Sequence, residues 1–136
     1  MPHLMLEYTN NLPESVDFAA LFARLNASVS EMTNVPIAQV KSRAVPRTIF
    51  RVGAGDPDAV FVHLTVSLLE GRDTALQKRL GERLMGHLRE AFARAYAERP
   101  CDITIEMHEM RRPTYVKDMN QIAKGPGGPA GPHQGD

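Results

Sequence analysis

Residues 60–69 read VFVHLTVSLL, and their side chains alternate between an apolar set and a mixed set. Alternation with a period of two is typical of a β-strand with one buried face. Residues 3–8 (HLMLEY) alternate in the same way, with Leu4, Leu6 and Tyr8 on one side. These two stretches therefore predict two strands, each with one face in the core.

Each predicted strand is followed by a helical pattern. Apolar residues recur at helical intervals over about residues 16–32, and leucines recur every four residues before Phe92 in a helix predicted over residues 73–98, with Asp73 as its N-cap. Further strands are predicted at 39–45 and 102–110. A short extended piece at 48–52 precedes the Gly-Ala-Gly-Asp-Pro turn signal of residues 53–57.

The two halves of the chain follow the same plan. An offset of about 60 residues places His3 on His63 and superposes the apolar faces of their strands. Two strands joined by a long helix form the crossover that parallel pairing requires. We therefore predict an α/β fold, a two-layer sandwich built from a duplicated β-α-β unit.

The sheet face opposite the helices has nothing to cover it in a monomer. It is predicted to carry His3, Met5, Glu7, Phe61, His63 and Thr65. Because several of these side chains are apolar or uncharged, packing against copies of the same chain is the natural remedy. His3 and His63 are expected to be hydrogen-bonded sheet histidines, since neither has a carboxylate or cysteine partner nearby in sequence.

The domain limits follow from composition. The segment from Lys124 reads KGPGGPAGPHQGD, in which eight of 13 residues are glycine or proline. Such a segment has too few apolar side chains to offset the entropy of ordering it. We predict one domain over residues 1–122, with halves at about 2–57 and 58–122, and a disordered tail over 123–136.

Charge and cysteine content exclude several classes of protein. The 136 residues carry 16 basic and 16 acidic side chains without a polybasic run, which disfavours nucleic acid and membrane partners. No apolar stretch approaches the roughly 20 residues that span a bilayer, and no leader pattern is seen, so a cytoplasmic protein is expected. The single cysteine, Cys101, is expected to be a half-buried small residue. No metal site and no cofactor are predicted.

Pro2 is the residue most able to carry chemistry. Removal of Met1 would leave a free secondary amine, and burial or neighbouring cations would lower the pKa of that amine from the ordinary range of about 7.7–8.0. An amine with a pKa near ~7 serves as a general base at neutral pH. A Met-Pro start also occurs where the terminus has no role, but here Pro2 opens directly into a predicted core strand.

Several short motifs in order resemble one enzyme family, the 5-carboxymethyl-2-hydroxymuconate Δ-isomerases of the tautomerase superfamily, over roughly residues 2–121. The matching features are Pro2 leading into a strand, Lys41-Ser42-Arg43, Phe61-Val62-His63, Gly71-Arg72, Ile105-Glu106 and Pro113-Thr114. The resemblance implies a homotrimer that needs no cofactor. It also implies a 1,3-proton transfer on a small anionic dienol in homoprotocatechuate breakdown, with Pro2 as general base.

The resemblance also implies which cations bind the substrate. Arg72 stands where the family has a substrate-binding arginine, in a loop before a helix N-terminus that itself favours anions. Lys41 stands where the family has a second arginine, and a lysine lacks the planar fork that grips a carboxylate. Arg43, on the same strand face as Lys41, is a candidate to share this role. The alternative for Arg72 is a solvated arginine in a loop without a functional role. The alternative for Lys41 and Arg43 is a strand edge that simply faces solvent.

Three functions remain open on the sequence. The first is the isomerase itself. The second is another proline-dependent tautomerase, acting on a simpler 2-hydroxymuconate or an arylpyruvate enol, which the lysine at position 41 leaves possible. The third is a non-catalytic trimeric binding protein of the same fold, which would retain Met1 because an acylated proline nitrogen has no lone pair to act as a base.

Overall fold

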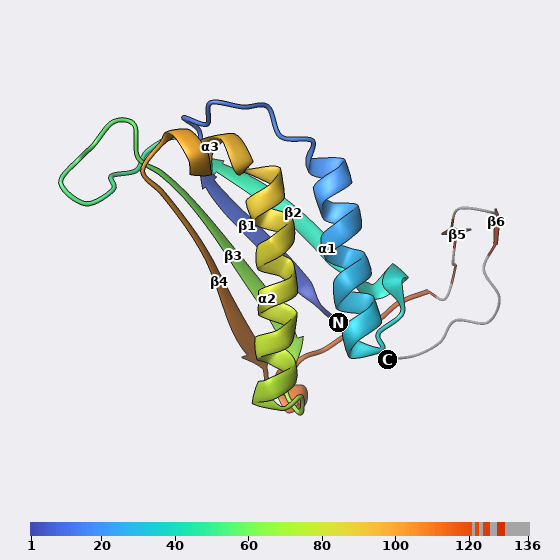
Figure 1. Cartoon of the computed structure of the whole chain (residues 1–136). Helices are drawn as coiled ribbons and strands as arrows, with labels where there is room; N and C mark the ends of the chain where they lie inside the picture. The colour runs from blue at the N-terminus through green and yellow to red at the C-terminus, as the bar shows by residue number, and fades with distance from the viewer. Residues whose placement is uncertain (121, 123, 126–127, 130–136) are drawn as a thin grey trace.

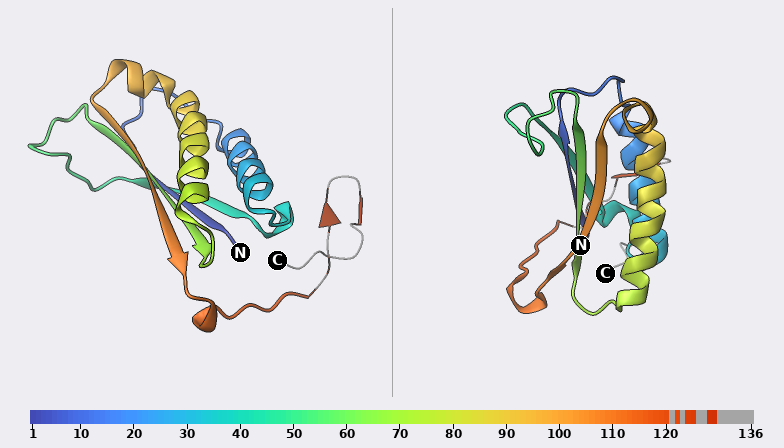
Figure 2. Two further views of the ribbon diagram at one scale, coloured as in Figure 1. Left: turned by 60° about the horizontal axis from the view of Figure 1, so that its bottom comes forward. Right: turned by 60° about the vertical axis from the view of Figure 1, so that its left-hand side comes forward.

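The computed structural model, which describes residues 1–120, 122, 124–125 and 128–129, places two long helices on one face of a four-stranded sheet (Figure 1). The strands are β1 (His3–Thr9), β2 (Lys41–Arg47), β3 (Val60–Leu69) and β4 (Cys101–Met110), in the order β2-β1-β3-β4. β1 pairs with β2 and β3 with β4 in parallel, while β1 and β3 are antiparallel. The right-hand view of Figure 2 shows the two layers, which confirms the predicted α/β sandwich.

The helices begin and end close to the predicted limits. α1 (Phe18–Thr33) is capped by Asp17, whose side chain accepts a hydrogen bond from the backbone N–H of Ala20 at 3.1 Å. α1 ends at Asn34, which has a φ of 58°, in the left-handed region. Asp73 caps α2 (Thr74–Ala91) in the same way, as predicted.

The second predicted helix is interrupted. α2 ends at Ala91, and a separate short helix, α3 (Ala93–Glu98), follows. Phe92 lies between them with φ of −107° and ψ of 30°, outside the helical region. Phe92 and Ala95 are both fully buried, so the break lets the chain turn while both side chains stay in the core. Leucine periodicity alone does not reveal this break.

The core lies between the helices and the sheet. The alternate residues Leu4 and Leu6 of β1 and Leu64 of β3 are fully buried, and so are Leu84 and Leu88 of α2. Full burial of one such side chain stabilises the fold by about 1.5–3 kcal/mol. Residues between them in the strands, such as His3 and His63, face away from the helices and are only half-buried. The face assignment made from alternation is confirmed.

Two details around β2 differ from the prediction. The strand begins at Lys41 rather than at residue 39, because Ile37–Gln39 form a short 3₁₀-helix, η1. The extended piece predicted at 48–52 is wrong: Thr48 and Ile49 bend, and residues 48–59 form a loop. β2 is an edge strand whose pairing with β1 ends at Arg47, so β1 offers no further backbone partner to residues beyond it.

The register of the central strands fits the predicted duplication. Met5 pairs with Thr65, and these two residues are also related by the offset of 60. A twofold rotation about this pair therefore exchanges β1 with β3 and approximately superposes the two halves. The starts of β1 and β2 and the ends of β3 and β4 consequently lie at one end of the sheet, called here the Pro2 end.

Beyond β4 the chain forms a second 3₁₀-helix, η2 (Arg112–Thr114), and then two paired two-residue strands, β5 (Lys124–Gly125) and β6 (Gly128–Pro129). The other residues of the predicted tail, 123, 126–127 and 130–136, lie outside the described residues. Its disorder and the domain limits stay predictions. Within the described part of the chain, no helix combines the length and apolar character needed to cross a membrane.

Candidate active site

Pro2 is attached to the edge strand β2 through its backbone. It is buried, it precedes β1 directly, and its carbonyl accepts a hydrogen bond from the backbone N–H of Lys41 at 3.1 Å. Met1 ahead of it is only 5% exposed. The amino end of the chain is therefore part of the sheet, which gives the Pro2 nitrogen a fixed position.

Met1 lies between two cavities at the Pro2 end of the sheet. One has a volume of about 330 Å³ and is lined by Gln39 and Lys41 among others. The second has a volume of about 250 Å³ and is lined by Leu69 and Arg112 among others. Met1, Tyr115 and Lys117 line both. Both cavities therefore border the residue that directly precedes Pro2.

Lys41 and Arg43 lie on the same side of β2, as predicted. Their register partners on β1 are His3 and Met5, which face away from the helices. Lys41 lines the larger cavity beside Met1, and its Nζ donates a hydrogen bond to the Gln39 carbonyl at 2.9 Å. Arg43 reaches the site only through His3, donating from Nη1 to the imidazole Nδ1 at 3.2 Å.

Arg72 lies in the loop between β3 and α2, also at the Pro2 end. Its Nη2 donates to the carbonyl of Thr33 at 3.2 Å, in the last turn of α1. A cation there satisfies an otherwise open helix carbonyl and complements the helix dipole. Neither cavity beside Met1 is lined by Arg72. The structure thus brings Pro2 and Lys41 together and turns the Arg72 guanidinium toward α1.

His3 connects β1 to the chain that follows β4. Its Nε2 lies 2.9 Å from the hydroxyl of Tyr115, and its Nδ1 lies 3.2 Å from Arg43. Burial, followed by the positive charges of Arg43 and Lys41, lowers the pKa of His3 from the ordinary value of 6.5. His3 is therefore neutral at physiological pH.

Sequence reasoning missed the other residues around Met1. Among them are Gln39, Arg112, Tyr115 and Lys117. Arg112, Tyr115 and Lys117 follow β4, in or just after the short helix η2, where no periodicity assigns a direction to a side chain. Gln39 was assigned to a strand, whereas it is a buried member of η1 at 2% exposure. A polar residue buried at a cavity is a signal of function only once the fold is known.

His63, the counterpart of His3, has different partners. Its Nδ1 lies 2.7 Å from the Thr104 hydroxyl and its Nε2 3.3 Å from the Glu106 carboxylate. The expectation of a hydrogen-bonded sheet histidine is therefore confirmed; its carboxylate partner, Glu106, is distant in sequence and is brought beside it by the parallel pairing of β3 with β4. Cys101 is half-buried as expected, and burial raises the pKa of its thiol, which makes it a poor nucleophile.

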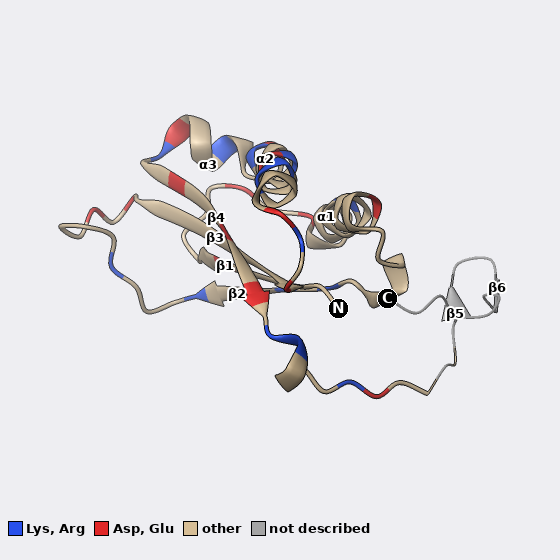
Figure 3. Cartoon of the chain, turned by 90° about the horizontal axis from the view of Figure 1, so that it is seen from below, with Lys and Arg blue, Asp and Glu red and all other residues tan. Residues whose placement is uncertain are grey.

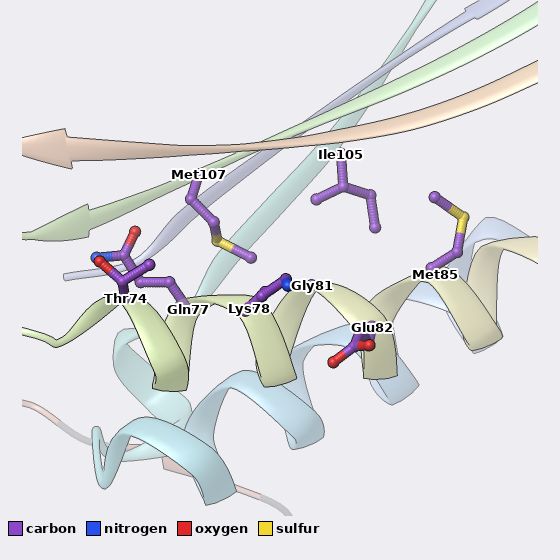
Figure 4. A pocket seen from close by; sticks show the side chains of 8 residues that line it. All are labelled: Thr74, Gln77, Lys78, Gly81, Glu82, Met85, Ile105 and Met107. Carbon is purple, nitrogen blue, oxygen red and sulfur yellow. The ribbon is translucent and has the colours of Figure 1, made fainter.

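A larger cavity of about 560 Å³ lies elsewhere, between α2 and β4 (Figure 4). Met85, Ile105 and Met107 line it, and its ionisable groups are Lys78 and Glu82. None of the predicted site residues reaches it. Among the described residues, no cluster of three histidine, cysteine or acidic side chains could hold a metal ion. The convergence of a buried terminus with several cations therefore favours the Pro2 end as the site.

Known structures share this fold. A 5-carboxymethyl-2-hydroxymuconate isomerase from Deinococcus radiodurans R1 is 30% identical, with a TM-score of 0.80 over 88% of this chain and 90% of that one. A structure described as a fused 4-OT wild type symmetric trimer has a TM-score of 0.68 over 87% and 92% of the two chains, at 18% identity. The architecture is that of the tautomerase superfamily, a class of small α/β proteins.

The sequence comparisons narrow this class. A curated 5-carboxymethyl-2-hydroxymuconate Delta-isomerase from Escherichia coli is 27% identical over 120 residues, which cover 88% of this chain and 95% of that protein. The sequence model of the 5-carboxymethyl-2-hydroxymuconate isomerase family matches residues 2–124. The chain belongs to this family, and the protein is an isomerase.

The contact between Arg43 and His3 can be tested through the pKa of His3. Replacing Arg43 by methionine removes a cation that disfavours the imidazolium, so we expect the pKa of His3 to rise toward 6.5. NMR titration of the imidazole resonances measures this shift. The matched control is Arg47→Met, because Arg47 pairs with Glu7 at 2.7 Å and does not contribute to the lowered pKa of His3. An unchanged pKa in Arg43→Met would contradict the assigned contact.

The lowered pKa of His3 also determines how its contribution to the free energy of unfolding changes with pH. Between the folded value and the ordinary 6.5, the unfolded chain binds more protons at this position than the folded chain. The contribution of His3 to stability is therefore present above pH 6.5 and is lost as the pH falls toward the folded value.

Proposed function

We propose that the protein converts 5-carboxymethyl-2-hydroxymuconate into its conjugated oxo tautomer, in homoprotocatechuate breakdown, with Pro2 as general base once Met1 has been removed. The main support is the position of Pro2, which is buried at the start of a central strand and directly follows Met1, a residue that lines two cavities also lined by cations. Membership of the isomerase family supports the same reaction class. The reaction needs no cofactor.

The proposed mechanism is the tautomerisation that the family resemblance implies, in which a proton moves from the 2-hydroxy oxygen to carbon 5. The Pro2 nitrogen takes the proton of the 2-hydroxy group, the electrons of the O–H bond form the new carbonyl, and the double bonds shift. A proton is then returned at carbon 5 from the prolinium, so the isomer has the same composition as the dienol. Burial and nearby cations lower the pKa of the free amine, so a large fraction is unprotonated at neutral pH.

Cations are proposed to bind the substrate, because its carboxylates and the enolate-like transition state are negatively charged. Lys41 lines the larger cavity beside Met1, and Arg43 lies next to His3 on the same face. A guanidinium carries five N–H donors, and the bond of Arg72 to Thr33 uses one of them. Arg72 is therefore proposed to hold a carboxylate while it remains tied to α1.

A second candidate is a proline-dependent tautomerase acting on a simpler 2-hydroxymuconate or an arylpyruvate enol. The observation that favours it is Lys41, because an ammonium is a point charge without the bidentate geometry of arginine. Comparing kcat/KM for both dienols and for an arylpyruvate enol on the same preparation decides between them.

We also propose a homotrimer. By their register positions, Lys41, Arg43 and Arg47 of β2 and Asp102 and Glu106 of β4 lie on the sheet face opposite the helices, which makes that face basic along one edge and acidic along the other. Figure 3 colours the basic and acidic residues along the ribbon. Opposite charges on opposite edges favour head-to-tail contacts, which close into a ring. The trimeric state of one tautomerase-fold relative agrees with this arrangement. A small anionic substrate rather than nucleic acid, and a cytoplasmic location, stay predictions.

The test of the general base has two parts. Intact-protein mass spectrometry is expected to show a chain without Met1, because an acylated proline has no basic nitrogen. A chain that retains Met1 would exclude every proline-dependent mechanism. Pro2→Ala is expected to ketonise the dienol more slowly, since a primary amine replaces the secondary amine; ultraviolet absorbance follows the reaction. Undiminished activity in this variant would remove Pro2 from the mechanism.

Arg72→Ala is expected to lower kcat/KM by about 10- to 1000-fold if the guanidinium meets developing negative charge. Its bond to Thr33 predicts a separate loss of thermal stability through the end of α1. Arg72→Lys is the matched variant, because it retains a cation without the planar fork. A loss of stability with unchanged kcat/KM would assign Arg72 to the helix end alone.

The assembly is tested by sedimentation equilibrium, which reports mass independently of shape. The expected mass is three times that of the 15.1 kDa chain. Reversing the charge at Glu106 to lysine would place like charges at the proposed head-to-tail contact, and we expect it to shift the mass toward the monomer. A dimer, or a trimer insensitive to this reversal and to salt, would contradict the charge-paired ring.

A further inference from the structure

The segment after β4 forms a side of the proposed active site. Residues 111–120, called here the C-terminal arm, leave β4 and cross the Pro2 end of the sheet (left view of Figure 2). Glu70 anchors the start of this arm: its carboxylate accepts from the backbone N–H of Arg112 at 2.7 Å, and its carbonyl accepts from Arg112 Nε at 3.0 Å. The arm is thus fixed to the end of β3.

Tyr115 on this arm has an oriented hydroxyl. Arginine donates and does not accept, so the 3.2 Å contact makes His3 Nδ1 an acceptor from Arg43. A neutral imidazole then carries its proton on Nε2 and donates it to the Tyr115 oxygen at 2.9 Å. Tyr115 therefore accepts the bond from His3, and Tyr115 lines both cavities beside Met1.

Lys117 brings a cation to the same place. Its Nζ lies 2.7 Å from the sulfur of Met1 and donates to the side-chain carbonyl of Gln39. Gln39 is 2% exposed, and its amide nitrogen lies 3.3 Å from the Met119 sulfur, so its orientation is fixed by burial and by a second residue of the arm. When Met1 leaves, the ammonium of Lys117 borders the space that the methionine occupied.

We propose that the C-terminal arm supplies two substrate-binding residues, with Tyr115 donating a hydrogen bond to the dienol and Lys117 binding one of its carboxylates next to Pro2. The proposal rests on the proposed function, because the space around Met1 is an active site only if Pro2 is the base. According to this proposal, residues of the C-terminal arm, which lies outside the β-α-β duplication, select an anionic substrate.

Lys117 also affects the basicity of Pro2. The charged groups that face Met1 are Lys41 on β2, Arg112 and Lys117 on the arm, and Asp118, which lines the larger cavity. His3 on β1 also faces this region and is neutral. Three cations and one carboxylate disfavour a protonated amine. Removing Lys117 is therefore expected to raise the pKa of the Pro2 amine.

Lys117→Met tests the cation, and Lys78→Met on α2 is the matched control. In the protein lacking Met1, we expect Lys117→Met to weaken binding of hexa-2,4-dienedioate, a dicarboxylate without the reactive hydroxyl, by about tenfold or more. The acidic limb of the kcat/KM profile is expected to move to higher pH. Lys117→Arg should restore binding, since the charge returns. Unchanged dicarboxylate binding together with an unmoved acidic limb would overturn the role of Lys117.

Tyr115→Phe tests the hydroxyl, with Tyr96→Phe on α3 as the matched control. We expect kcat/KM to fall by about 10- to 100-fold in Tyr115→Phe, the range for a lost hydrogen bond to a charged acceptor, while the melting temperature falls only slightly through loss of the bond from His3. His3→Gln, which alters the group that orients the hydroxyl, should lower kcat/KM in the wild-type chain but have little further effect in Tyr115→Phe. Equal effects of His3→Gln in both backgrounds would overturn the orientation by His3.

These results separate the two proposals. If Pro2→Ala slows ketonisation while the Tyr115 and Lys117 variants behave like their controls, the proposed function stands and the role of the arm fails. If Pro2→Ala leaves the rate unchanged, the proposed function fails, and binding of the dicarboxylate then reports on the Lys117 site by itself.

Discussion

The backbone hydrogen bonds of β1 are the constraint on which the proposed site depends. The chain begins in an interior strand, paired with β2 on one side and β3 on the other, so its first residues have little freedom to move. The bond from the Lys41 N–H to the Pro2 carbonyl extends this pairing to the residue ahead of the strand. A terminal amine, normally the most mobile group of a protein, thereby acquires a defined place.

The duplication explains why one sheet end is chemically special and the other is not. The twofold relation about Met5 and Thr65 makes His3 and His63 counterparts, yet their neighbours have opposite charge. Arg43 contacts His3, whereas Glu106 contacts His63. The same β-α-β frame therefore presents a basic environment near the chain start and an acidic one at its counterpart. Only the basic environment suits an anionic substrate and an unprotonated amine.

Much of the architecture could be predicted because local patterns coincide with the tertiary arrangement. Alternation in HLMLEY and VFVHLTVSLL assigned the buried face correctly, since Leu4 and Leu64 are fully buried while His3 and His63 are not. The interruption at Phe92 and the bend at Thr48 were not predicted. Both arise where backbone geometry is set by long-range packing or by the end of a strand pairing, and neither changes the apolar period that the sequence displays.

The sequence by itself determined the two β-α-β units, the faces of their strands and the candidacy of Pro2, because each depends on the order and period of neighbouring residues. Only the tertiary structure decided which side chains surround Met1. Tyr115 and Lys117 follow the start of the chain by more than a hundred residues, and Arg72 turns toward the Thr33 carbonyl. Such contacts depend on how parallel pairing brings distant strand ends together. Local sequence patterns therefore do not predict which residues come into contact there.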